Sequence, residues 1–458
     1  MNITLVGGAC IFLFVVLLVH SRLRLYALVT MPLFMILLMY FNYFGSYERM
    51  DLLLEVNVLL FFSFCLFLSG YSIGRHLRPR RIEHFYINLS NRVLTNDRVF
   101  ISRRCVNAYF AVTVIYCIFN LWLNTQLYGS LENALIRFYG KAQADDFPSI
   151  FSTMQGFLNK ALMAFVFVFR FYFNKYHQKS YMFYFTVLLL VLIAVPGGSR
   201  GAAVAPMVLL VVADFFSFTL LKGVSIRRRL KEYIFIVGFS FFLILSLSMI
   251  RNIDFDEIND VYRAVSELNM REAGESYSEG EGDLILEDVQ RCYLEFGNHV
   301  PFLSPFYTLE TLVLAPIPRV LKPDKKVSFG YVLNEVKSGG SSLDPERLIY
   351  HGAVGWAAGL AGEGWANGGL FGVVFYALLF GFYSGLCANM YYRLLHHGTP
   401  LSLLFALLFF QMSYNFIRGD LLAGYAQGIY PLLIVTLLSC FIRHIRKYRI
   451  RLRRFGKA

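Results

Sequence analysis

The sequence has few charged residues. Asp, Glu, Lys and Arg make up 16% of its 458 residues, whereas an average soluble domain is about a quarter charged. None of its seven cysteines has a partner at the spacing of zinc ligands, so we expect neither a metal site nor a disulfide. The sequence also contains no phosphate-binding glycine loop and no G-x-S-x-G motif. The low charge is not typical of a soluble enzyme, the cysteine spacing is not that of a disulfide scaffold, and the missing motifs argue against nucleotide hydrolysis.

Apolar residues, in contrast, are abundant. They make up 57% of the chain, and they recur in long runs separated by short polar segments. A helix needs about 20 apolar residues to cross the hydrocarbon core of a bilayer. The sequence therefore predicts an all-α polytopic membrane protein with about eleven transmembrane helices, at 3–20, 26–44, 53–74, 106–128, 152–173, 181–196, 201–221, 232–250, 366–392, 400–417 and 421–442.

The basic residues predict the orientation of these helices. The net charge is +13, and the cations cluster in short segments between the apolar runs, which is typical of a membrane protein rather than a nucleic-acid-binding protein. The short connections on one side carry 26 Lys and Arg residues, against five on the other. Because positive charge is retained in the cytoplasm, we expect a periplasmic N-terminus and a cytoplasmic C-terminus. The first run has no preceding basic residue, so we expect an uncleaved first helix.

One connection, 251–365, is far longer than the others. Its aromatic and apolar stretch from Val289 to Leu314 is not typical of disorder. We therefore expect a helical periplasmic cap at 251–365, between eight membrane helices in 1–250 and three in 366–442. The basic segment 443–458 is predicted to be a cytoplasmic tail that contacts membrane lipids.

The segment V-P-G-G-S-R-G at 195–201 suggests an anion site. Pro196 and two glycines end one predicted span, and Ser199 suits the N-cap of the next. Arg200 then lies in a first helical turn, where free N–H groups already favour an anion and a cation is normally disfavoured. We interpret Arg200 as facing a bound anion, and the alternative is a tight turn with a snorkelling arginine.

A second cationic segment runs from Pro316 to Lys326. Its three prolines hold the chain extended, and four cations lie within eight residues, among them Arg319 and Lys322. Arginine donates two parallel hydrogen bonds to a phosphate group. We interpret the segment as a shaped phosphate site. The alternative is a basic loop that touches anionic lipid.

Two candidate bases lie near the start of the ninth predicted span. Glu363 follows a stretch of glycines at helical spacing, and a carboxylate at that depth costs free energy unless it is paired or used. It is either a catalytic base or an interfacial partner of an arginine. His351 is the other candidate base, although a lone histidine is more often structural. Arg418, with Asp420, lies between the last two spans, where an ion pair is the simpler interpretation.

Three motifs together resemble the bacterial O-antigen polymerases of the Wzy type, which polymerise oligosaccharide repeat units. They are G-G-S-R-G at 197–201, P-R-x-x-K-P at 318–323 and G-E-G-W-A-N-G-G-L-F-G at 362–372. The expected topology, with one large outer loop before the last three helices, is similar to that of the family as well. The motifs span about residues 195–385. After Asn367, this chain has Gly368-Gly369-Leu370, where the family usually has an aromatic residue and a glycine.

The resemblance implies a GT-C-like glycosyltransferase of the bacterial inner membrane. Its donor would be a growing glycan on undecaprenyl diphosphate, and its acceptor a new lipid-linked repeat unit. The resemblance implies no metal and no cofactor, and a polysaccharide chain-length regulator (a co-polymerase) as protein partner. In this chemistry Glu363 or His351 would accept the proton of the acceptor hydroxyl. The leaving diphosphate would be neutralised by cations, namely Arg200, Arg319, Lys322, Arg347 and Arg418.

Two other functions remain open. One is the ligase that moves finished glycan to lipid A core, by the same chemistry with a different acceptor. The other is a transporter of lipid-linked glycan without catalysis, which predicts charges along several spans and no large outer loop. The expected spans carry only a few charges, which counts against a transporter: Glu55, Lys160, Arg170 and Asp214 within spans, and Glu232 at the start of one.

Overall fold

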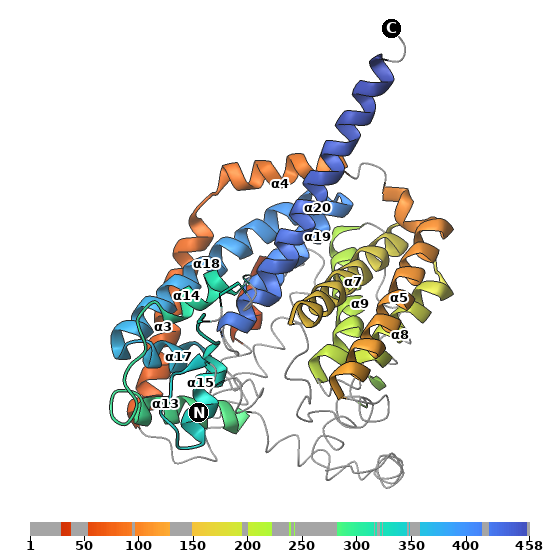
Figure 1. Cartoon of the computed structure of the whole chain (residues 1–458). Coiled ribbons are helices and arrows are strands. Elements are labelled where there is room, and N and C mark those ends of the chain that lie inside the picture. The colour runs from red at the N-terminus through yellow and green to blue at the C-terminus, as the bar shows by residue number, and fades with distance from the viewer. Residues whose placement is uncertain are drawn as a thin grey trace. The chain divides into compact units, whose positions relative to one another are not determined.

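The structure is a computed structural model, and its named elements are all helices (Figure 1). Among the described residues there is one isolated bridge, between Phe296 and Val300, and no strand. The spans expected at 3–20 and, apart from three residues, at 232–250 lie outside the described residues. The structure describes residues 29–37, 54–93, 97–128, 149–194, 200–221, 238–239, 242, 282–315, 317, 321–322, 324–345, 348, 358–414 and 421–455.

Several helices are apolar enough to lie in a membrane. Four of them are also long enough to cross one, and they coincide with spans predicted from the sequence: Leu54–His76, Arg103–Gln126, Ala203–Leu220 and Gly369–His397. Three shorter apolar helices overlap the spans expected at 181–196, 400–417 and 421–442: Tyr181–Ala194, Pro400–Met412 and Gly428–His444. The chain is therefore an all-helical, multi-pass membrane protein.

The chain divides into two compact units. The first unit combines residues 1–95 and 281–458. Within it, α13, α15 and α17 gather at one end of α3 and α18, whereas α4 lies across the other end (Figure 1). Its helices are α3 (Leu54–His76), α4 (Arg80–Val93), α13 (Gly282–Glu295), α14 (Tyr307–Leu314), α15 (Phe329–Lys337), α17 (Gly359–Ala366), α18 (Gly369–His397), α19 (Pro400–Met412) and α20 (Leu421–Phe455).

The closest helix pair of this unit is α3 and α18, which run parallel. Each helix carries two glycines four residues apart: Gly70 and Gly74 on α3, Gly381 and Gly385 on α18. A Cβ atom would lie 2.4 Å from the Leu378 carbonyl oxygen if added at Gly70, and 2.2 Å from the Phe67 carbonyl oxygen if added at Gly381. The two backbones are therefore in direct contact, as small residues allow in membrane helices.

We predict that Gly74→Ala destabilises this pair by about 1–3 kcal/mol. The new methyl carbon would lie 2.0 Å from the Phe382 carbonyl oxygen and 3.0 Å from the Leu386 nitrogen, which are backbone atoms that cannot rotate away. This clash outweighs the roughly 1 kcal/mol that alanine gains over glycine in a helix. The midpoint of unfolding in mixed micelles measures the effect. Ser72→Ala, an exposed change on the same helix, should shift it by less than about 0.5 kcal/mol.

A tight connection joins α18 to α19. Gly398 ends α18 in the left-handed region (φ 61°), where a side chain is disfavoured. Thr399 then caps α19: its hydroxyl oxygen accepts a hydrogen bond from the Ser402 N–H at 3.3 Å, and Pro400 takes the first helical position. This local sequence turns the chain back within two residues.

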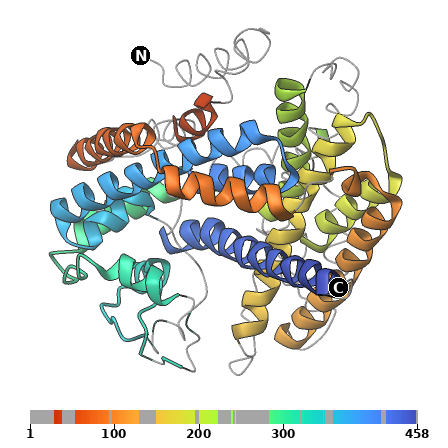
Figure 2. The ribbon, with the colours of Figure 1, turned by 90° about the horizontal axis from the view of Figure 1, so that it is seen from above.

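Helix α4 lies in a segment that we expected to be only a connection. It is amphipathic: Tyr86 and Leu89 are buried, whereas Arg80, Arg81 and Arg92 are exposed. The Tyr86 ring contacts Phe405 and Phe409 of α19, with centroids 4.6 and 5.4 Å apart. Figure 2 looks down onto this helix, in orange, as it lies across the blue helices of its unit. An apolar face against the bundle and a cationic outer face are typical of a helix at the headgroup level.

The apolar core of the first unit is continuous from the helices of 282–366 into the membrane helices. It includes Phe296 of the segment after α13, Phe329 and Leu333 of α15, and Phe67 and Tyr376 of α3 and α18. The described part of 251–365 contains the helices α13, α14, α15 and α17 joined by turns and coil, and α13 and α17 pack directly on α3.

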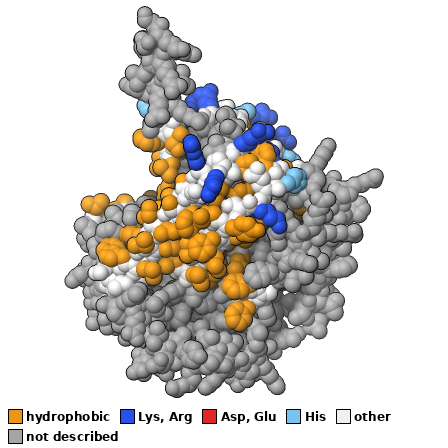
Figure 3. All heavy atoms as spheres, turned by 90° about the vertical axis from the view of Figure 1, so that its right-hand side faces the viewer, with side chains coloured by type: hydrophobic (Ala, Val, Ile, Leu, Met, Phe, Trp, Pro, Cys, Tyr) orange, Lys and Arg blue, Asp and Glu red, His pale blue; other side chains and the backbone are white. Residues whose placement is uncertain are grey.

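The second unit, residues 96–280, is a helical bundle with a short 3₁₀ segment (η2, Asp97–Ile101). Figure 3 shows one of its faces, where apolar side chains gather and basic ones lie along one edge. Among the exposed apolar side chains of this unit are Ile115 and Ile118 of α5 and Leu192 of α8. Such a band beside a cationic edge is typical of a lipid-facing surface next to the headgroup layer. The bundle consists of α5 (Arg103–Tyr128), α7 (Ser149–Lys175), α8 (Tyr181–Ala194) and α9 (Arg200–Leu220).

Candidate functional site

The motif at 362–372 forms a helical hairpin. Helix α17 ends at Ala366 and α18 begins at Gly369, so the predicted span 366–392 starts after a break that hydropathy did not indicate. Gly368 and Gly369 have φ values of 153° and 62°, which only glycine adopts easily. A Cβ atom at Gly372 would lie 2.0 Å from the Gly364 carbonyl oxygen. The glycines of the motif therefore allow α17 and α18 to touch.

Glu363 is buried at the centre of this hairpin, with 1% of its surface exposed. Its Oε1 accepts a hydrogen bond from the Thr308 hydroxyl at 2.6 Å, and its Oε2 accepts one from the Leu421 N–H at 2.9 Å. The Asn367 amide donates to the same Thr308 oxygen at 2.7 Å. The carboxylate therefore joins α14, α17 and α20, and it lies at the N-terminus of α20, where free N–H groups and the helix dipole favour negative charge.

Two buried polar atoms of the same motif have no hydrogen-bond partner among the described residues. They are Oδ1 of Asn367 and Nε1 of Trp365. The Trp365 ring packs against Tyr293 and Phe302, with centroids 4.7 and 6.1 Å apart. Because buried polar atoms are nearly always satisfied, this acceptor and this donor can serve a polar ligand.

Cys292 also contacts this hairpin, but it is not a nucleophile. Its Sγ lies 3.5 Å from the position of a Cβ at Gly362. Complete burial, together with the carboxylates of Asp288 and Glu363, raises the pKa of Cys292 well above its usual value. A thiol with a raised pKa stays protonated, so Cys292 is an inert core residue.

Several cations of the cap are held in structural contacts. Lys337 of α15 binds Asp288 of α13 at 2.6 Å, and burial nevertheless raises the pKa of Asp288. Lys326 binds Glu310 at 2.5 Å and lies over the Tyr307 ring. Lys325, also part of the predicted phosphate segment, donates to the carbonyl oxygens of Ala315 and Ile317 at 3.2 and 2.7 Å. These two lysines of the phosphate segment therefore support the fold around α14.

The other predicted site residues are described only in part. Lys322 is half-buried in the segment that follows α14. Arg200 is the first residue of α9, as the cap pattern predicted. Its side chain is not among those that the structure describes. Arg200 belongs to the second unit, whereas Glu363 belongs to the first. Four residues lie entirely outside the described part of the chain: His351, Arg319, Arg347 and Arg418. Thr308 and the α20 N-terminus were not predicted.

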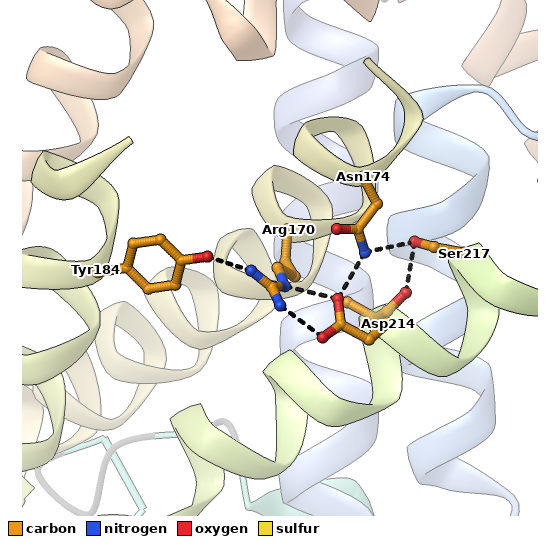
Figure 4. Close-up of polar contacts among 6 residues, drawn as sticks. Arg170, Asn174, Tyr184, Asp214 and Ser217 are labelled. Atoms are coloured by element: carbon orange, nitrogen blue, oxygen red, sulfur yellow. Dashed lines mark hydrogen bonds and ion pairs between the residues drawn. The ribbon is translucent and has the colours of Figure 1, made fainter. Parts of the chain in front are cut away.

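A second buried polar cluster lies in the other unit (Figure 4). The Arg170 guanidinium of α7 and the Asp214 carboxylate of α9 form two parallel contacts at 2.6 Å, Nε to Oδ1 and Nη2 to Oδ2. Both side chains are at most 2% exposed. Arg170 also donates to the Tyr184 hydroxyl of α8, and Asn174 donates to Asp214 at 2.6 Å. This network ties three helices together.

The fold and these clusters define the chain as an all-helical, multi-pass membrane protein with buried carboxylates. Comparison with protein-family models, with curated proteins and with solved structures finds no match to the chain. Within the described ranges, no group of three or more His, Cys, Asp or Glu side chains could hold a metal ion.

Proposed function

We propose that the chain is a glycosyltransferase of the bacterial inner membrane that polymerises a lipid-linked polysaccharide of the O-antigen type. It would transfer a growing glycan from undecaprenyl diphosphate to a new lipid-linked repeat unit at the periplasmic face, on a GT-C-like scaffold of about eleven membrane helices. The observation that carries the proposal is the buried Glu363 carboxylate, held by Thr308 and the α20 N-terminus within the family-like motif.

The reaction needs the two kinds of group that the sequence supplies. The bond between the sugar C1 and the diphosphate oxygen breaks, a bond from C1 to the acceptor oxygen forms, and the hydroxyl proton passes to a base. We assign the base to Glu363, with His351 as the other candidate. The departing diphosphate keeps the bonding electrons, and the cations proposed to neutralise it are Arg200, Arg319, Lys322, Arg347 and Arg418.

The direction of the helices supports a site on the outer face. Glu363 lies just before the start of α18, whereas Arg393 lies near its other end. The positive-charge rule assigns the cationic end to the cytoplasm and hence Glu363 to the periplasmic side. Because α3 and α18 run parallel, an odd number of crossings must separate them. The five spans predicted from the sequence at 106–128, 152–173, 181–196, 201–221 and 232–250 would supply such an odd number.

Reconstitution tests this proposal against its alternatives. The full-length protein in liposomes should convert undecaprenyl-diphosphate-linked repeat units into a ladder of longer glycans on a gel. Transfer only to added lipid A core would identify the ligase. Movement of the lipid-linked unit across the bilayer with no new glycosidic bond would identify a transporter, and either result would overturn polymerisation.

Removing an arginine of the proposed diphosphate site should weaken donor binding. Arg200→Ala and Arg319→Ala are each expected to raise the donor concentration needed for half-maximal polymerisation about tenfold, because each removes charge-assisted hydrogen bonds. Arg→Lys should recover part of the loss, since lysine lacks the planar fork. The exposed Arg104→Ala is the matched control. Unchanged donor dependence in either alanine variant would eliminate that arginine from the site.

A further inference from the structure

A cationic pocket lies at the opposite end of the first unit from Glu363. Its volume is about 570 Å³, within the range of sites that bind small molecules. The ends of α3 and α18, the start of α4 and Val29 form its walls. Asn389 fixes the geometry, because its amide donates to the carbonyl oxygens of Arg75 and Leu77 at 3.0 and 2.6 Å. The end of α3 is thereby bound to α18, and the pocket is preformed.

The charges that line the pocket are unbalanced. It contains three arginines, Arg75, Arg78 and Arg393, but one carboxylate, Glu83. Glu83 already binds Arg393, with Oε2 2.7 Å from Nη1, and the Arg393 Nε donates to Asn389 at 2.8 Å. Arg75 and Arg78 form no ion pair with any described residue. Three histidines also line the pocket and offer ring nitrogens: His76, His396 and His397.

The positive charge left in the pocket is larger than the partial negative charges of the two helix C-termini can neutralise. Cations are often found at helix C-termini, because each terminus carries about half a negative charge. The ends of α3 and α18 therefore neutralise roughly one of the two charges left after the Glu83 pair. An excess of about +1 remains, which matches one phosphodiester group rather than a diphosphate.

The surroundings of the pocket favour a lipid as the source of that group. Helix α3, which supplies Arg75, and helix α4, which supplies Glu83, also carry exposed apolar side chains. These are Ile73 on α3 and Ile82 and Phe85 on α4, which are 57%, 51% and 43% exposed. An amphiphile can thus place its phosphate among the arginines and its acyl chains along this apolar surface. Basic pockets between membrane helices on the cytoplasmic side commonly bind anionic headgroups.

We propose that this pocket binds the phosphodiester headgroup of an anionic phospholipid, with Arg75 and Arg78 as the phosphate donors. Each arginine can present two parallel N–H groups to phosphate oxygens. The site is separate from Glu363 and does not depend on the proposed polymerase activity.

Lipid titration tests the proposal. The full-length protein in neutral detergent is titrated with phosphatidylglycerol, and native mass spectrometry counts the bound lipids. We expect one tightly bound phosphatidylglycerol, and phosphatidylcholine with the same acyl chains should bind at least tenfold more weakly. Arg75→Gln with Arg78→Gln should lower the phosphatidylglycerol affinity at least tenfold while leaving size-exclusion behaviour unchanged. If the double variant does not fold, Arg78→Gln alone, at an exposed position between α3 and α4, is tested in its place.

The matched control is Arg80→Gln with Arg81→Gln, which removes two exposed cations from the neighbouring first turn of α4. This variant should retain the bound lipid. Equal loss in the control, or retention of phosphatidylglycerol when Arg75 and Arg78 are both replaced, overturns the proposal. Displacement of the lipid by millimolar inorganic phosphate would overturn the lipid source and assign the pocket to a soluble phosphate. The absence of displacement supports the lipid.

Discussion

Glu363→Gln is expected to fold normally and to lower the rate of polymerisation by about 10² or more. Glutamine has the shape of glutamate, so its oxygen can still accept the Leu421 N–H and its amide can donate to the Thr308 oxygen. It cannot take up the proton of an acceptor hydroxyl. The substitution therefore separates the chemical role of the carboxylate from its role in joining α14, α17 and α20.

The rate and the donor affinity are measured separately with purified lipid-linked repeat units. Donor affinity should survive, because the arginines remain in place. Glu310→Gln is the matched control: it neutralises another carboxylate of this unit, on α14, which is more exposed and pairs with Lys326. A near-normal rate in the Glu363 variant would show that the carboxylate is not the base, and the assignment would then move to His351.

Arg170→Ala is expected to destabilise the second unit by about 3–5 kcal/mol. The substitution leaves the Asp214 carboxylate buried, 1% exposed, without its bidentate partner. The neighbouring Asn174 amide donates a hydrogen bond to Asp214, but this amide is neutral and cannot balance the negative charge of the carboxylate. Unfolding of the purified protein in mixed micelles, followed by far-UV circular dichroism, measures the loss.

A second variant separates lost charge from lost packing. Arg170→Met combined with Asp214→Leu removes both charges while keeping the volume, and it should recover most of the stability, since an apolar pair often replaces a buried ion pair without loss. Arg104→Ala, an exposed change in the same unit, should cost less than about 0.5 kcal/mol. Wild-type stability of Arg170→Ala would contradict the view that the network holds α7, α8 and α9 together.

Hydropathy predicted the helices well, because length and apolar composition decide which segments can cross a bilayer. The span expected at 53–74 is α3, Leu54–His76, and the one expected at 106–128 falls within α5. Hydropathy could not find the break between α17 and α18, since Asn367 and two glycines interrupt the apolar run only briefly. Hydropathy also missed α4, because this amphipathic helix mixes apolar and basic residues and its mean hydropathy is therefore low.

The candidate site was predicted only in part. The sequence singled out Glu363, because a carboxylate near a membrane span is costly without a partner. It could not identify Thr308, whose contact with Glu363 joins residues 55 positions apart and depends on how α14 packs. The sequence showed Arg170 and Asp214 as charged residues within predicted spans. Because their charges are opposite, the sequence could have predicted that they form an ion pair.

Helix α20 has a further consequence for the proposed enzyme. It is 35 residues long, which at 1.5 Å per residue corresponds to about 52 Å, whereas the hydrocarbon core is about 30 Å thick. Its first amide holds the Glu363 carboxylate, and its far end carries the basic tail expected to rest on the inner headgroups. The length of the helix would thus fix the distance between the carboxylate and the inner headgroups. In the proposed orientation, a thinner or thicker bilayer would change the depth of the carboxylate relative to the outer headgroups, and membrane thickness would itself become a variable of the proposed reaction.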